Sequence, residues 1–156
     1  MYLFLKLLHV TAVILFLGNI ITGIFWHAHA ARTRDPRLLH HAVDGIIRSD
    51  RWFTLPGVLV IVVTGILAAI HARLPLLGTP WIAWGLALFS VSGILYAARV
   101  APLQQQMRTL TRVGLQNGTF DYAQYHSLAR RWEWWGAAAL LAPLAALVVM
   151  VLKPGA

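Results

Sequence analysis

The sequence contains no cysteine and only five acidic residues, four aspartates and one glutamate, in 156 positions. The absence of cysteine excludes disulfides, thiolate metal sites and thiol redox chemistry. There is also no glycine-rich phosphate loop, no nucleophile elbow and no zinc-protease motif, and no pair of carboxylates lies within an apolar run. The sequence therefore gives no support to a hydrolase or a nucleotide-driven machine.

Apolar residues dominate what is present. Hydrophobic residues make up 59% of the chain and charged residues 12%, a balance typical of proteins that reside in lipid. The formal net charge is +8, but the basic residues gather in the connections beside the apolar runs. This distribution favours contact with anionic lipid headgroups and control of topology. We therefore expect the lipid bilayer as a partner and do not expect nucleic acid.

Four apolar runs meet the requirement of about 20 residues for a helix that crosses a bilayer. They cover residues 2–26, 52–72, 80–100 and 134–152. No strand-like alternation is visible, and within lipid only helices and closed barrels satisfy every backbone group. The sequence therefore predicts an all-α membrane four-helix bundle, a single transmembrane domain over residues 1–156.

The arginines distinguish the two sides of the membrane. The first and third connections between the runs hold nine basic residues, namely Arg32, Arg34, Arg37, Arg48, Arg51, Arg108, Arg112, Arg130 and Arg131. The middle connection holds only Arg73. Because basic connections stay in the cytoplasm, the pattern predicts an N-out, C-out arrangement.

Both arginine-rich connections carry helical patterns. In the first, Asp35 can cap a helix that begins at Pro36, and one face of that helix is apolar, with Leu39, Val43, Ile46 and Ile47. We expect this interfacial helix to lie flat on the membrane. In the second, the helical pattern runs to about Leu115, breaks at Asn117 and Gly118, and resumes from Thr119, which predicts an extended helical hairpin.

Six tryptophans lie near the predicted ends of the runs, as an interfacial aromatic belt requires. They are Trp52, Trp81, Trp84, Trp132, Trp134 and Trp135. Asn19 lies deep in the first run, where a hydrogen bond to a neighbouring helix is the expected role of a polar side chain.

Lys6 and His9 are the strongest indications of function, because an ionisable group within a span is costly and normally faces the bundle interior or water. At 100° per residue they share one face with His27, which lies five turns further along. A neutral imidazole can ligate haem iron, and a four-helix bundle can hold a porphyrin. The alternative is that His9 only bonds a neighbouring helix while Lys6 extends to the headgroups.

Other residues are weaker candidates. His71 ends the second run and could be a second haem ligand, although it lies roughly 9 Å above His9 by rise per residue. The imidazoles that flank the arginine-rich surface could bind a metal or be solvated interfacial residues; they are His27, His29, His40 and His41. Glu133 could relay protons or form an ion pair at the start of its helix.

Three patches resemble known proteins: Leu5-Lys6-Leu7-Leu8-His9 with Leu17-Gly18, Arg48 to Arg51 leading into Leu55-Pro56-Gly57 and Thr64-Gly65, and the ending Val148 to Pro154. Together they look like a family of uncharacterised bacterial integral membrane proteins, similar in outline to HemJ-type protoporphyrinogen oxidases and CopD proteins. The resemblance implies a haem b site at His9, beside Lys6, in a bacterial inner membrane. It does not imply the HemJ reaction, because Trp81-Ile82-Ala83-Trp84-Gly85 lacks the lysine of those enzymes.

The sequence therefore predicts a membrane haem b protein, with His9 as the iron ligand and with Lys6, His27 and His71 as further residues of the cofactor site. Its expected role is electron transfer or an oxidoreductase reaction. The alternative is a non-enzymatic assembly subunit or a small-solute permeation component. Under either hypothesis a homodimer or another membrane protein is a plausible partner.

Overall fold

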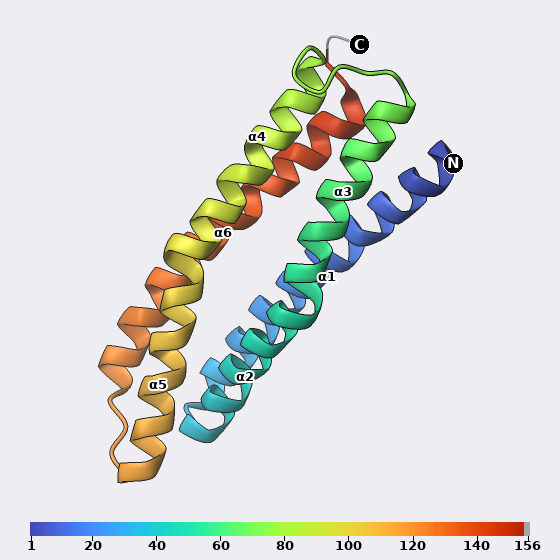
Figure 1. The fold of residues 1–156 in the computed structure, drawn as a ribbon. Coiled ribbons are helices and arrows are strands. Elements are labelled where there is room, and N and C mark those ends of the chain that lie inside the picture. The colour runs from blue at the N-terminus through green and yellow to red at the C-terminus, as the bar shows by residue number, and fades with distance from the viewer. Residues whose placement is uncertain (155–156) are drawn as a thin grey trace.

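The computed structural model describes residues 1–154, which contain helices and no strand (Figure 1). The elements are α1 (Tyr2–Thr33), α2 (Pro36–Ser49), η1 (Asp50–Thr54), α3 (Leu55–His71), α4 (Pro80–Leu95), η2 (Tyr96–Val100), α5 (Ala101–Asn117) and α6 (Tyr122–Leu152). Because α2 continues through η1 into α3, and α4 continues through η2 into α5, the eight elements form four long helices. Each is apolar and long enough to cross a membrane, which confirms the four predicted spans.

The long helices pair side by side into two antiparallel couples, α1 with α3 and α4 with α6 (Figure 1). Both chain ends lie at one extremity of the molecule, which we call the terminal end. At the opposite extremity, the arginine-rich end, α2 packs against both α1 and α5. Within residues 1–154, no Cα atom of α3 lies within 8 Å of a Cα atom of α4. The two couples therefore meet at the arginine-rich end and diverge toward the terminal end.

The ends of the helices follow from their capping residues. The Asp35 carboxylate accepts a hydrogen bond from the Arg37 backbone N–H at 2.8 Å, which confirms the predicted start of α2. Gly118 ends α5 in the left-handed conformation, with φ of 68°, a geometry that glycine adopts at little cost. The next helix begins later than predicted, because Asp121 and not Thr119 caps it by accepting from the Gln124 N–H at 2.9 Å. The extended hairpin of α5 and α6 is confirmed.

The main core lies at the arginine-rich end, between α2, α5 and α6. Its most buried members, Val43 and Met107, come from α2 and α5. The predicted apolar face of α2 is confirmed, since Leu39, Val43, Ile46 and Ile47 are all buried. Its surroundings differ from the prediction: α5 covers that face, and α2 is continuous with the second span. The prediction of a separate interfacial helix that lies flat on the membrane is therefore not confirmed.

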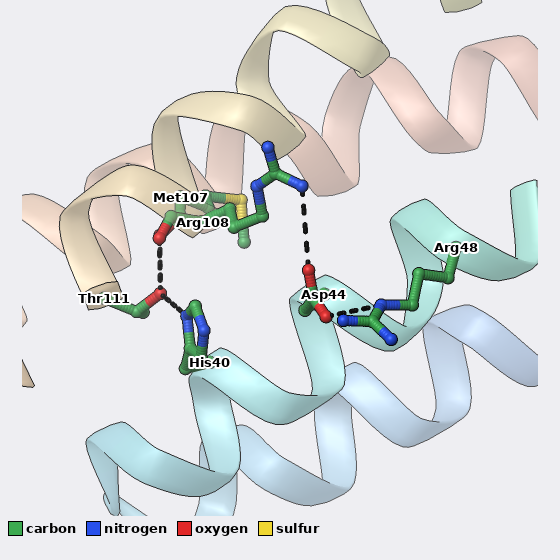
Figure 2. Close-up of polar contacts among 6 residues, drawn as sticks. All are labelled: His40, Asp44, Arg48, Met107, Arg108 and Thr111. Carbon is green, nitrogen blue, oxygen red and sulfur yellow. Dashed lines mark hydrogen bonds and ion pairs between the residues drawn. The ribbon is translucent and has the colours of Figure 1, made fainter. Parts of the chain in front are cut away.

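Polar contacts hold α2 against α5 (Figure 2). The Nδ1 of His40 lies at hydrogen-bond distance, 2.9 Å, from the Thr111 hydroxyl oxygen, and that hydroxyl donates to the Met107 carbonyl at 3.0 Å. The Asp44 carboxylate forms ion pairs with Arg48 of its own helix at 2.8 Å and with Arg108 of α5 at 3.6 Å. His40 thus has a packing role between α2 and α5.

A π-helical turn, which is wider than an α-helical one, interrupts each of two long helices, and a proline follows shortly after each turn. In η1 the Leu55 N–H donates to the Asp50 carbonyl, and Pro56 follows; in η2 the Ala101 N–H donates to the Tyr96 carbonyl, and Pro102 follows. A proline has no N–H to donate, and its ring collides with the carbonyl four residues earlier. A π-helical turn relieves that collision, and such turns are frequent at functional sites.

Gly114 is required where α5 meets the turn into α6. A Cβ placed there would lie 2.8 Å from Cδ2 of Phe120 and 3.0 Å from the Thr119 carbonyl oxygen. Because a backbone atom cannot move aside cheaply, Gly114→Ala should destabilise the protein by about 1–3 kcal/mol. The measurement is unfolding by denaturing detergent. Gly136→Ala is the matched control, because no atom lies within 4 Å of its Cβ position, and it should be neutral or stabilising.

Candidate functional site

A cleft of about 550 Å³ lies between the two helix couples toward the terminal end. Its walls come from α1, α3, α4 and α6 and are mostly apolar, with Phe89 and Pro143 among them. The polar side chains on it include Lys6, His9 and Lys153. An apolar cleft of this size with a few polar groups is the usual form of a site for a small molecule or cofactor.

His9 is held in this cleft by α3. Its Nδ1 lies 2.9 Å from the Ile61 carbonyl oxygen and 3.4 Å from the Thr64 hydroxyl oxygen. A carbonyl can only accept, so Nδ1 carries the proton and the lone pair of the neutral ring resides on Nε2. Gly65 makes room for the ring, because a Cβ there would lie 3.1 Å from Cε1 of His9. One ring nitrogen is thereby fixed, and the other keeps its capacity to ligate a metal.

Two lysines supply positive charge to the cleft. Lys6 lines it from α1 and is exposed. Lys153, just beyond α6, also lines it and places Nζ 5.3 Å from the centre of the Trp81 ring. Both lie within a few residues of the chain's two ends, so the charge is at the terminal end of the cleft. This arrangement suits a ligand whose body is apolar and whose edge is anionic.

Met150 fills space that Gly85 leaves open. The Met150 methyl group would collide with a Cβ at position 85. Both residues line the cleft. The thioether is therefore packed against the wall of the same cavity that contains His9.

The other two predicted members of the site lie elsewhere. His71 is exposed at the end of α3 and does not line the cleft. His27 is buried at the arginine-rich end, with 1% of its surface exposed. The structure thus brings together Lys6 and His9, as predicted, but does not place His27 or His71 with them.

His27 is enclosed by residues of α6. Its Nε2 lies 3.0 Å from the Tyr125 hydroxyl, and its Nδ1 lies 3.8 Å from a Glu133 carboxylate oxygen. The Trp132 ring packs edge-on at 4.8 Å between centres. Trp132 is itself 5% exposed, so it belongs to the core and not to the predicted aromatic belt. Its Nε1 is, within residues 1–154, the one buried side-chain nitrogen or oxygen without a hydrogen-bond partner.

The remaining histidines do not form a metal site. Within residues 1–154 no three His, Cys, Asp or Glu side chains converge as metal ligands would. His27 bonds Tyr125 and His40 bonds Thr111, while His29 and His41 are exposed. The hypothesis of an imidazole metal site at the arginine-rich surface is therefore not supported by the arrangement, and His27 is buried instead of solvated.

Asp50 is the polar residue that sequence reasoning missed. It is 6% exposed and receives four donors: Asn19 at 3.4 Å, Thr54 at 2.8 Å, Tyr96 at 3.2 Å and Gln104 at 2.9 Å. The donors come from α1, η1, η2 and α5, so one carboxylate joins three of the four long helices. The sequence feature that could have identified Asp50 is its position just before the start of an apolar run.

The chain matches the family described as "Predicted integral membrane protein (DUF2269)" over residues 3–154. The chain belongs to this family. No curated protein and no solved structure matches it. The DUF2269 match covers all four spans, which confirms the predicted membership of an uncharacterised membrane family. The likeness to HemJ and CopD proteins stays a prediction from the quoted patches.

The cleft of this DUF2269 member fits a haem by the chemistry of its residues. A porphyrin supplies four nitrogen ligands itself, so it needs one or two protein ligands and no cluster of three. Histidines that ligate metals usually donate their other ring N–H to a carbonyl or carboxylate, as His9 does toward Ile61. The apolar walls suit the macrocycle, and the lysines suit its carboxylates.

Proposed function

We propose that this protein binds haem b in the cleft at its terminal end and serves in electron transfer or in an oxidoreductase reaction. The observation that carries the proposal is the His9 ring, whose Nδ1–H is engaged by Ile61 while Nε2 is left free beside a cleft of about 550 Å³. We further propose a bacterial inner membrane as its location. There the arginine-rich end faces the cytoplasm and both termini face outward.

Each residue has a defined task under this proposal. His9 would ligate the haem iron, and the Ile61 carbonyl would fix its tautomer and the orientation of its ring. Lys6 and Lys153 would pair with the carboxylates of the group, and the apolar walls would exclude water. Haem, when bound, supplies one-electron chemistry. Nothing in this assignment requires His27 or His71.

The test is the reduced-minus-oxidised absorption spectrum of the protein purified in mild detergent. We expect a Soret band and an α band, and we expect His9→Ala to lose both. His71→Ala is the matched control and should keep them, because His71 is exposed outside the cleft.

A second variant separates ligation from folding. His9→Gly leaves a space in which free imidazole can ligate in place of the side chain, so added imidazole should restore the bands. A colourless wild-type protein, or bands that His9→Ala leaves unchanged, would contradict the haem proposal. A colourless protein that purifies with a membrane partner would favour the assembly alternative.

A further inference from the structure

A second hollow, of about 540 Å³, runs between α1 and α2 at the arginine-rich end, and we call it the α1–α2 groove. All of its lining residues belong to these two helices, from Asn19 to Thr33 on α1 and from Leu38 to Ser49 on α2. The buried face of α2 is already occupied by α5, so the groove uses mostly another face of α2 and shares only Ile46 with the buried one. The segment of α1 from Asn19 to Thr33 corresponds to a length of about 20 Å at the helical rise.

Small residues line the groove, and they leave space unfilled. They are Gly23, Ala30, Ala42 and Gly45. A Cβ at Gly45 would meet no atom within 4 Å, and one at Gly23 would meet only Ile46 at 3.5 Å. At the end of the groove away from the turn between α1 and α2, two polar side chains are satisfied within the protein. Asn19 donates to Thr54 at 2.9 Å, and Ser49 donates to the Ile46 carbonyl at 3.0 Å. This part of the groove therefore suits a narrow apolar chain.

Aromatic and basic residues line the part of the groove nearer the turn between α1 and α2. Trp26 lines the groove with 55% of its surface exposed, and its ring lies 5.8 Å from that of His29. His29 and His41 line the two walls, and both are exposed. Tryptophan favours the headgroup level of a bilayer, so the groove extends from that level toward the apolar interior.

The charge around the groove is positive on balance, with Asp35 the one carboxylate in the turn between α1 and α2. Its lining contains no carboxylate. Three exposed arginines, Arg32, Arg34 and Arg37, surround the turn between α1 and α2, and none of them forms an ion pair within residues 1–154. Basic pockets between membrane helices bind anionic lipid headgroups. The site thus combines a place for a phosphate with a place for an acyl chain.

We propose that the α1–α2 groove binds one anionic phospholipid, with its phosphate beside the arginines of the turn and one acyl chain along the glycines and alanines. The proposal is independent of the haem proposal, because the two hollows share no lining residue. The probe is phosphatidylglycerol with brominated acyl chains, added as a minor component to phosphatidylcholine vesicles that contain the protein. Bromine quenches tryptophan fluorescence on contact, and the difference between the wild type and Trp26→Phe isolates the signal of Trp26.

We expect brominated phosphatidylglycerol to quench Trp26 at lower concentration than brominated phosphatidylcholine does. Each of Arg34→Gln and Arg37→Gln should reduce that preference about fivefold, the equivalent of about 1 kcal/mol per basic residue. Gly45→Leu should abolish it by filling the space that the chain would occupy. Gly18→Leu is the matched control and should not change it, because Gly18 is also an exposed helical glycine with open space but lies outside the groove.

Three results would overturn the proposal. Equal quenching by the two brominated lipids in the wild type would show that the groove does not select an anionic lipid. A preference for phosphatidylglycerol that survives Gly45→Leu would show that surface charge alone attracts the lipid. If a second copy of the chain filled the groove, neither lipid would quench Trp26, which would also overturn the proposal.

Discussion

Replacing Asp50 with alanine should lower the free energy of unfolding by about 2–5 kcal/mol, because it leaves buried donors without their acceptor. Gln104 and Tyr96 would lose the carboxylate oxygen to which both donate, at 2.9 and 3.2 Å. Asn19 retains Thr54 as a partner, so its loss is smaller. The measurement is the stability of the purified protein against denaturing detergent.

The matched control for Asp50 is another aspartate of the same long helix. Asp44 pairs with Arg48, whose side chain is 77% exposed, and at 3.6 Å with Arg108, whose side chain is 36% exposed; such pairs contribute about 0–1 kcal/mol each. Asp44→Ala should therefore cost less than about 2 kcal/mol and less than Asp50→Ala. Equal losses for the two variants would show that the four donors around Asp50 contribute no more than a surface ion pair does.

Replacing His27 with alanine should destabilise the protein by about 2–5 kcal/mol. The substitution removes a side chain that is almost fully buried and leaves the Tyr125 hydroxyl without the nitrogen that lies 3.0 Å away. The loss should appear in the same detergent titration. The pigment spectrum should not change in protein that remains folded, because His27 does not line the cleft.

Two further variants locate the origin of that loss. Tyr125→Phe removes only the hydroxyl and should cost about 1–2 kcal/mol, because the His27 Nε2 then has no partner. His126→Ala, next to Tyr125 but exposed, should change stability by less than about 0.5 kcal/mol. If His27→Ala cost no more than His126→Ala, the packing of His27 between Tyr125 and Trp132 would have no energetic importance.

The spans and several helix ends could be predicted because they depend on local chemistry. Length and apolarity define a membrane helix, and Asp35 with Pro36 defines a helix start wherever it occurs. The wide turns were not predicted, although Pro56 and Pro102 were visible, because proline at this position is equally compatible with a simple helix start. The turns become apparent only in the structure, where the helices continue without a break through Asp50–Thr54 and Tyr96–Val100.

The site could be predicted only in part, because burial depends on which helices become neighbours. The face shared by Lys6 and His9 follows from helical periodicity, and the structure places both on one cleft. His27 shares that face, yet α6 covers it with Tyr125 and Trp132. Asp50 was missed for the same reason, because the donors Tyr96 and Gln104 lie about 50 residues further along the chain.

The separation of the α3 and α4 backbones bears on how the proposed haem would reach the cleft. In a bilayer, the side between these helices would border acyl chains and not water. An apolar molecule already dissolved in the membrane could then enter sideways, without first being extracted into solution. Delivery of the proposed ligand would depend on how well it partitions into lipid, and its aqueous concentration would matter little.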